Sequence, residues 1–451
     1  MNLSPEEIAA ALGAEVVAEG ESGSPTRAVI DSTEAGPSDL FFGLRGERRD
    51  GGEFAATAIE AGAWGAVVSP AWRSSFLAHR AKKDERRAWV FAVEDPLAAM
   101  QALARAWRRA LGARVLGVTG SVGKTSVKDI ARTLLPGRVH ANRENLNTEI
   151  GLPLTLLEAP DDTETLVLEM AMRGKGQIAE LAAIAEPEVA VITNVGPVHV
   201  ELLGSVEAIA AAKAEILDDL PADGTAVAPV EAGELEPHLE RAPRQLRFGP
   251  GGDVEAVEVK VADGVTEVLI STPLGSQRFH LPFTEAHNLT NALAAIAAGV
   301  AFGADLSTMA DRAASIGFSR FRGERLELPG GIVLVNDCYN ANPVSMRAAL
   351  DHLAGLGAQR TVAVLGEMAE LGPGAPGYHR EVGEHARAHG IELVIGVGEP
   401  ARDYAPDELV GDPEEAAELL AARLQPGDAV LVKGSRSAGL EAVAESLREI
   451  V

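Results

Sequence analysis

The chain has 451 residues, a net charge of −26 and one cysteine, Cys338. At roughly 150 residues per domain, this length predicts about three domains. The acidic balance excludes general nucleic-acid binding and adhesion to anionic membranes, which need basic surfaces, and one cysteine excludes an intrachain disulfide. The N-terminus lacks a signal-peptide pattern, and the longest apolar run, around 291–302, is too short to span a bilayer. We therefore expect a cytoplasmic protein that binds neither nucleic acid nor membrane.

The first part of the chain is expected to form a small α/β domain at residues 1–95. A dense run of charges at 81–87 lies between two apolar stretches. Such a run is typical of an exposed loop or linker, so it marks the approach to the end of this domain.

From residue 96 onward, short runs of Val, Ile and Leu alternate with Ala-rich helical patterns. The pattern predicts a helix over 96–111 and then strands at 114–118, 165–168, 189–192 and 224–228. This alternation is typical of a parallel sheet covered by helices. Between 252 and 283 apolar and polar residues alternate, which indicates an inserted antiparallel hairpin. We place this central domain at 96–318.

A third block repeats the alternation of strands and helices. Its strands are predicted at 332–335, 361–365, 393–397 and 429–432. The block is placed at 319–451, which gives three α/β domains in all, the central one with a mostly parallel sheet.

The sharpest motif is a glycine-rich loop at 117–126, with the sequence GVTGSVGKTS. It follows a predicted strand and opens a helix predicted at 127–135. Backbone N–H groups there can surround a phosphate, and Lys124 can reach the β- and γ-phosphates. The hydroxyl of Thr125 can bind Mg²⁺. Although Val118 stands where the standard loop has a glycine, the combination favours a nucleoside-triphosphate site over an ordinary strand–turn–helix corner.

Glu169 and His199 each follow a predicted strand of the same sheet. Ligands collect at the carboxyl ends of such strands, and a carboxylate suits Mg²⁺, which prefers oxygen ligands. His199 by itself would be an ordinary loop histidine, but beside Glu169 and the phosphate loop it becomes a candidate ligand. Lys213 lies on a helix predicted at 206–217, where the residues alone indicate a surface lysine with a packed alkyl stem.

Two further groups of polar residues are candidates for ligand contact. Asn288 and Asn291 share one helix face, and their amides match the edge of adenine, although Asn288 could equally cap the helix. The turn at 336–343 follows a predicted strand and is rich in polar residues. These residues either only form the turn or line the mouth of a second ligand cleft. Cys338, within that turn, has no Cys or His near it in the sequence and is interpreted as structural.

In this order, these segments resemble the Mur ligase family, the ATP-dependent enzymes that form amide bonds in peptidoglycan-precursor synthesis. The resemblance spans the chain through TGSVGKTS, LEMAMRGKGQIAEL, ITNVGPVHVELLGSVEAIAAAKAEI, HNLTNALAA and NDCYNANPVSMRAAL. The last of these, together with VAVLGEMAELG, is most similar to the branch that adds D-alanyl-D-alanine. The resemblance implies an N-terminal UDP-sugar-binding domain, a central P-loop-type ATPase domain and a Rossmann-like C-terminal domain that binds the ribose side of ATP and D-alanyl-D-alanine.

The resemblance also implies roles for individual residues. Lys124, His199 and Lys213 would be catalytic, and two Mg²⁺ would bind Thr125, Glu169, His199 and a carbamoylated Lys213. ATP would contact Gly120, Ser121, Val122, Gly123, Lys124, Thr125, Ser126, Asn288, Asn291, Asp337 and an upstream arginine, best matched by Arg325 with Arg322 as the other candidate. The other substrates would contact Ser32, Thr33, Arg45, Asn145, Asn147, Thr148, Tyr339, Asn340 and Asn342.

Several positions depart from the family pattern. Thr33 replaces an arginine, so a uridine-diphosphate contact is missing or is supplied by Arg45 or Arg48. Gly52, Glu285 and Cys338 replace the expected histidine, glycine and serine.

The implied reaction joins D-alanyl-D-alanine to UDP-N-acetylmuramoyl-tripeptide through an acyl phosphate, in an enzyme expected to be a monomer. One alternative is another amide ligase of the superfamily, such as the diamino-acid-adding enzyme or a folylpolyglutamate-type synthetase. A second alternative is a P-loop ATPase that forms no new bond.

Overall fold

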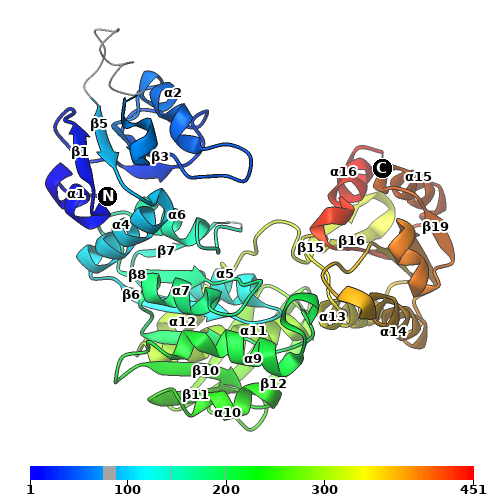
Figure 1. Ribbon diagram of the computed structural model, residues 1–451. Coiled ribbons are helices and arrows are strands. Elements are labelled where there is room, and N and C mark those ends of the chain that lie inside the picture. The colour runs from blue at the N-terminus through cyan, green and yellow to red at the C-terminus, as the bar shows by residue number, and fades with distance from the viewer. Residues whose placement is uncertain (75–87, 144, 199, 451) are drawn as a thin grey trace.

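The computed structural model describes residues 1–74, 88–143, 145–198 and 200–450. These residues form four sheets, which Figure 1 shows distributed along the chain from the blue N-terminal part to the red C-terminal part. The charge run predicted as a loop at 81–87 lies outside the described residues. The α/β class predicted from the sequence is confirmed.

The N-terminal part contains a five-stranded sheet in the order β1-β5-β4-β3-β2. Only β1 runs antiparallel to its neighbour, β5. All four residues of β3 are buried, as expected of a central strand covered on both faces. The elements are β1 (Glu15–Ala18), β2 (Arg27–Val29), β3 (Asp39–Phe42), β4 (Gly65–Val68), β5 (Trp89–Ala92), α1 (Pro5–Leu12) and α2 (Ala55–Glu60).

The central part is built on a six-stranded sheet in the order β11-β10-β9-β6-β8-β7, with every pair parallel. Strand β6 lies between β8 and β9, so the strand order reverses at the carboxyl end of β6. Open α/β sheets bind ligands at such a reversal. The strands are β6 (Arg114–Thr119), β7 (Val139–Ala141), β8 (Thr165–Glu169), β9 (Val189–Ile192), β10 (Thr225–Pro229) and β11 (Arg244–Phe248).

Helices surround this sheet (Figure 1). They are α4 (Pro96–Leu111), α5 (Lys124–Leu134), α6 (Gly151–Glu158), α7 (Gln177–Ala185), α8 (Val200–Leu203), α9 (Val206–Lys213), α10 (Glu236–Leu239), α11 (Ala286–Ala301) and α12 (Leu306–Ala313). Helix α5 begins three residues before the predicted start, directly after the glycine-rich loop. The helix predicted at 206–217 ends as α9 at Lys213 and continues as a 3₁₀ turn, Ala214–Leu217.

The predicted antiparallel hairpin is a three-stranded sheet, β12 (Glu255–Ala262), β13 (Val265–Thr272) and β14 (Gly275–Leu281). Alternate residues of β13 and β14, among them Val268, Ile270 and Phe279, are buried in the core of the central part. The alternating valines at 257, 259 and 261 in β12, which helped to predict the hairpin, are instead exposed. Alternation therefore identified the strand but not the face that is buried.

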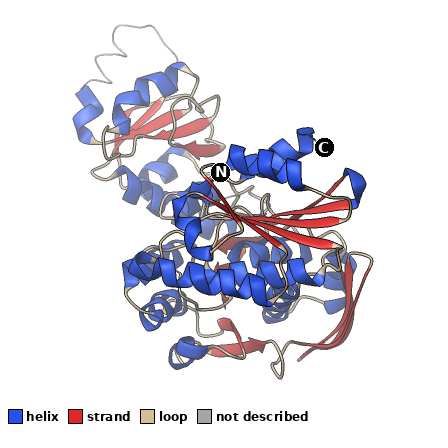
Figure 2. Ribbon diagram, turned by 90° about the vertical axis from the view of Figure 1, so that its right-hand side faces the viewer, coloured by secondary structure: helices blue, strands red, loops and turns tan. Residues whose placement is uncertain are grey.

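The C-terminal sheet has the order β15-β16-β20-β17-β18-β19, with only β15 antiparallel. Helices cover both of its faces and enclose two apolar clusters (Figure 2). The elements are β15 (Glu324–Leu328), β16 (Ile332–Asn336), β17 (Arg360–Leu365), β18 (Leu393–Val397), β19 (Glu408–Val410), β20 (Asp428–Lys433), α13 (Pro343–Gly355), α14 (Ala375–Ala388), α15 (Pro413–Arg423) and α16 (Glu441–Ile450). None of the helices in the described part of the chain is long and apolar enough to cross a membrane.

Candidate active site

The glycine-rich loop connects β6 to α5 with backbone angles that favour glycine. Gly120 has φ +147° and Gly123, the residue before α5, has φ +85°. A Cβ on Gly120 would overlap the side chain of Thr193, and one on Gly123 would overlap Asn291 of α11. The two glycines therefore allow both the backbone conformation and the close packing of neighbouring elements.

The end of β9 holds the loop in place. The backbone N–H of Ser121 donates to the carbonyl oxygen of Asn194 (3.0 Å). The N–H of Val122 donates to Oδ1 of the same residue (2.9 Å). The hydroxyl of Ser121 also donates to the carbonyl oxygen of Gly196 (3.1 Å). These bonds preorganise the loop before any phosphate binds.

Three side chains at the end of β6 and β8 provide a cation and oxygen ligands. Lys124 Nζ donates to the carbonyl oxygen of Gly120 at 2.8 Å, and desolvation lowers the pKa of its ammonium although the Glu169 carboxylate opposes this. Thr125 Oγ1 donates to Glu169 Oε2 at 2.8 Å. Asn147 Nδ2 donates to the other carboxylate oxygen at 2.9 Å. A hydroxyl and a buried carboxylate this close fit the oxygen ligands that Mg²⁺ prefers.

Lys213, at the C-terminal end of α9, is buried rather than on the surface, which corrects the interpretation from the residues alone. Burial, and then the charge of Lys124, lower the pKa of its ammonium well below the ordinary value. No hydrogen bond or ion pair joins the side-chain ammonium of Lys213 to any other residue that the structure describes. His199, the proposed second metal ligand, lies outside the described residues.

A cleft of about 1280 Å³ brings most of the predicted residues of the central and C-terminal parts together, but Gly120, Lys213 and Arg325 do not line it. It exceeds the roughly 300–1,000 Å³ typical of a site for one small ligand. Its lining includes Ser121, Val122, Gly123, Lys124, Thr125, Ser126, Asn145, Asn147, Thr148, Glu169, Asn288, Asn291, Asp337, Tyr339, Asn340 and Asn342.

The predicted residues of the N-terminal part do not line this cleft. Thr33 is exposed, and its backbone N–H and hydroxyl both donate to Asp31, which lowers the pKa of that carboxyl. Arg45 is exposed on a neighbouring loop. A Cβ on Gly52 would overlap the indole ring of Trp72, so the histidine expected there would not fit.

The polar turn after β16 contains an ion pair that sequence reasoning missed. Lys433, buried at the end of β20, donates from Nζ to Asp337 Oδ2 at 2.6 Å and to the carbonyl oxygen of Asn340 at 3.0 Å. The available signal was its position directly after the strand predicted at 429–432. Asn342 caps α13 by accepting the backbone N–H groups of the second and third helical residues. Its predicted contact with substrate would add to this structural role.

The structure separates the two candidate arginines. Arg322 lines the main cleft, and its guanidinium lies 4.0 Å from the ring centroid of Tyr339. Its Nε is buried without a hydrogen-bond partner among the described residues. Arg325 instead lines a neighbouring pocket of about 450 Å³. His287 lines both pockets, so the two arginines approach the same region from different sides.

The two asparagines of α11 are buried and directed toward each other. Asn291 Nδ2 donates to Asn288 Oδ1 at 3.2 Å. The N-cap position of α11 is Glu285 and not Asn288, so the capping alternative is wrong. Cys338 is buried, and desolvation raises the pKa of its thiol to about 12, which agrees with a structural role.

Comparison with known proteins agrees with this architecture. Residues 118–299 match the Mur ligase middle domain, and residues 321–436 match the Mur ligase glutamate ligase domain. A UDP-N-acetylmuramoyl-tripeptide–D-alanyl-D-alanine ligase from Synechocystis sp. is 37% identical, over 91% of this chain and 89% of the relative. The chain belongs to the Mur ligase family.

Solved structures show the same relationship. MurF from Acinetobacter baumannii is 27% identical to this Mur ligase and superposes with a TM-score of 0.88, covering 100% of this chain and 99% of the other. MurF from Thermotoga maritima in complex with ADP is 31% identical, with a TM-score of 0.81 and coverage of 94% and 97%. This Mur ligase is therefore an ATP-dependent enzyme that forms C–N bonds.

Proposed function

We propose that this Mur ligase joins D-alanyl-D-alanine to UDP-N-acetylmuramoyl-tripeptide and converts ATP to ADP and phosphate. The observation that carries the proposal is the single cleft shared by the phosphate loop and the polar turn after β16. A nucleotide switch needs only the phosphate loop, whereas a ligase must hold an acceptor beside it. The relatives and structures described above have the same activity in their names.

The first step is attack of the tripeptide carboxylate on the γ-phosphorus of ATP. Both groups are anionic, so the cleft must offset their repulsion. Lys124 supplies positive charge at the phosphates, and Thr125 and Glu169 would hold a Mg²⁺. When bound, the ion neutralises phosphate charge and orients the phosphate oxygens. Asn288, Asn291 and Asp337 would contact adenine and ribose, together with Arg325 from the neighbouring pocket or Arg322 from the main cleft.

Lys213 is proposed to carry a carbamate. Its lowered pKa keeps more of the amine neutral, and a neutral amine can attack CO₂. An N–C bond then forms, the nitrogen loses a proton, and the product carries anionic oxygens suited to Mg²⁺. Lys213→Ala should abolish ligation, and a short carboxylate such as acetate should restore part of it. Full activity of Lys213→Ala without acetate would contradict this role.

The second step is attack of the free amine of D-alanyl-D-alanine on the acyl phosphate. The C–N bond forms, phosphate leaves and the amine releases a proton. Tyr339, Asn340 and Asn342 would contact the dipeptide. The N-terminal part would hold the UDP-sugar through Ser32, Thr33 and Arg45. Asn145, Asn147 and Thr148, on the wall of the cleft, would lie along the peptide.

The deciding experiment measures phosphate release from ATP with UDP-N-acetylmuramoyl-tripeptide, with and without D-alanyl-D-alanine, and determines the product mass. We expect release that needs both substrates and a product with the mass of the pentapeptide precursor. Ligation of a diamino acid or glutamate instead would favour another ligase of the superfamily. Phosphate release that is independent of any acceptor, with no new mass, would contradict the proposal.

A further inference from the structure

A cluster of metal-ligating side chains lies outside the cleft, between α13 and α14. Asp351 comes from α13, His385 comes from α14, and His389 follows the end of α14. One helical turn earlier on the two helices, Arg347 and Glu381 form an ion pair (3.7 Å). Two residues of the cluster are therefore held on packed helices in a fixed register, and the third lies in the turn directly after one of them.

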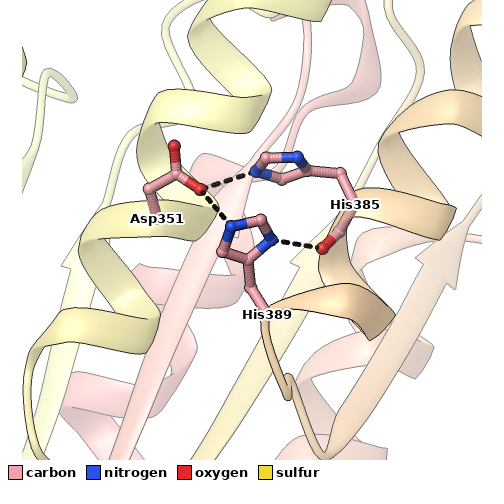
Figure 3. A group of neighbouring side chains, drawn as sticks. All are labelled: Asp351, His385 and His389. Carbon is pink, nitrogen blue, oxygen red and sulfur yellow. Dashed lines mark hydrogen bonds and ion pairs between the residues drawn. The ribbon is translucent and has the colours of Figure 1, made fainter.

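The three side chains converge on one carboxylate oxygen, as Figure 3 shows. Asp351 Oδ1 lies 2.6 Å from His385 Nε2 and 3.5 Å from His389 Nε2. All three ligand atoms lie within 4.8 Å of one another. Two ligands of a tetrahedral zinc ion are about 3.3 Å apart, so small side-chain rotations would bring the three atoms to that geometry.

The hydrogen bond of His389 leaves its other ring nitrogen free to bind a cation. Its Nδ1 lies 2.9 Å from the backbone carbonyl oxygen of His385, which can only accept, so Nδ1 carries the proton. In the neutral ring the lone pair of Nε2 then faces the Asp351 oxygen, which is a second acceptor. A metal ion between them would bind both this lone pair and the carboxylate oxygen. A backbone carbonyl on the far nitrogen is also what usually orients a metal-bound histidine.

The two imidazole rings lie close enough to bind one ion together. His385 Nε2 faces the same carboxylate oxygen, and the two imidazole rings are stacked with centroids 4.0 Å apart. Protonating both rings would place two like charges in that stack, opposite one carboxylate. One divalent cation replaces both protons and uses the lone pairs of both rings.

We propose that Asp351, His385 and His389 bind one zinc ion in a site separate from the catalytic cleft. Two imidazole nitrogens and one carboxylate oxygen leave a fourth position for water. Mg²⁺ does not compete for this site, because it prefers oxygen ligands. The bound ion would link α13 to α14. Because the residues that begin α13 lie in the wall of the cleft, it would also strengthen that wall.

The test is calorimetric titration of the full-length protein with ZnCl₂ in excess Mg²⁺, which keeps oxygen-ligand sites occupied. We expect one equivalent of zinc to bind. His389→Ala and Asp351→Asn should weaken binding by at least about tenfold. His280→Ala, which removes an exposed histidine from β14, should bind zinc as the unmodified protein does. Zinc should also raise the melting temperature of the unmodified protein and of His280→Ala, by mass action.

Asp351→Asn keeps the size of the side chain and removes its charge. It therefore tests zinc binding even if His389→Ala does not fold. Loss of the zinc-dependent rise in melting temperature in Asp351→Asn would support the site. Zinc binding that is unchanged in Asp351→Asn would place the ion elsewhere and overturn the proposal, as would a failure of the unmodified protein to bind zinc.

Discussion

Single residues give the cleft a charge opposite to that of the whole chain. The protein carries −26, yet Lys124 and Arg322 both line the cleft. Burial is the largest cause of the lowered pKa of Lys124; the carboxylate of Glu169 opposes it, and the charge of Arg322 adds to it. Cations held this close repel one another, and the phosphates of ATP would relieve the repulsion. Part of the affinity for ATP is therefore prepared in the folded protein.

Replacing Lys124 tests whether the positive charge of the cleft acts on the phosphates of ATP. Lys124→Met should lower kcat/KM for ATP by roughly 10²–10³, the usual effect of removing one preorganised donor to a developing negative charge. Phosphate release in the presence of both other substrates measures the effect. Lys260→Met, at an exposed position of β12, is the control and should leave the rate unchanged. A loss below tenfold would show that Lys124 does not contact the reacting phosphates.

At the scale of elements, the phosphate loop depends on how closely α11 packs against the start of α5. Gly123→Ala should destabilise the protein by roughly 1–3 kcal/mol and weaken ADP binding, since it adds strain at positive φ and a clash with Asn291. Gly204 has the same φ of +85° and open space around it. Gly204→Ala therefore isolates the backbone strain. Equal losses of stability in urea and equal ADP affinities for the two variants would contradict a role for packing.

The loop after β17 is held to α14 by one histidine. His379 Nε2 accepts the backbone N–H of Met368 at 3.0 Å, and Nδ1 lies 2.7 Å from the carbonyl oxygen of Ala375. The ring must therefore be neutral, and burial lowers its pKa. Ala369 and Glu370, the next residues along, line the cleft. Protonation of this ring would loosen one cleft wall.

The expected consequence is a loss of stability in acid. The unfolded chain binds the His379 proton near pH 6.5, whereas the folded chain binds it only at lower pH. The contribution of His379 to the free energy of unfolding is thus constant above about pH 6.5. It falls as the pH drops toward the pKa of the folded state. The side chain of His379→Gln cannot titrate. The variant should therefore have a lower free energy of unfolding in urea than the unmodified protein, and this difference should shrink as the pH drops across that range. A deficit that is constant with pH would contradict this assignment.

Over the whole molecule, the described residues on the two sides of the cleft are joined by polar side-chain contacts. His352 of α13 lies 3.4 Å from Glu285 at the start of α11, and Arg173 lies 3.8 Å from Glu370. Glu285 is one of the residues that depart from the family pattern, so this contact between the parts was not expected. Such polar contacts can re-form during a movement of one part relative to the other.

The size of the cleft predicts closure. An acyl phosphate hydrolyses when water reaches it, so the parts should move together once the substrates bind. Small-angle X-ray scattering with an ATP analogue and UDP-N-acetylmuramoyl-tripeptide should show a smaller radius of gyration than the protein alone. The tripeptide substrate without nucleotide is the control. An unchanged radius with both ligands would argue against closure.

The sequence alone determined the parts of this protein that depend on local pattern. Apolar runs predicted eight parallel strands of the central and C-terminal sheets within about a residue, because strands buried on both faces need continuous apolar side chains. The edge strands β7, β11 and β19 are less buried and were not predicted. The glycine-rich loop could be identified from the sequence because consecutive residues determine both its backbone conformation and its contacts with phosphate. Only the tertiary structure showed that Lys213 is buried, that Lys433 pairs with Asp337, and that Arg322 rather than Arg325 lines the main cleft. Those properties depend on residues far apart in the chain, and their burial and pKa are set by neighbours that the fold brings together.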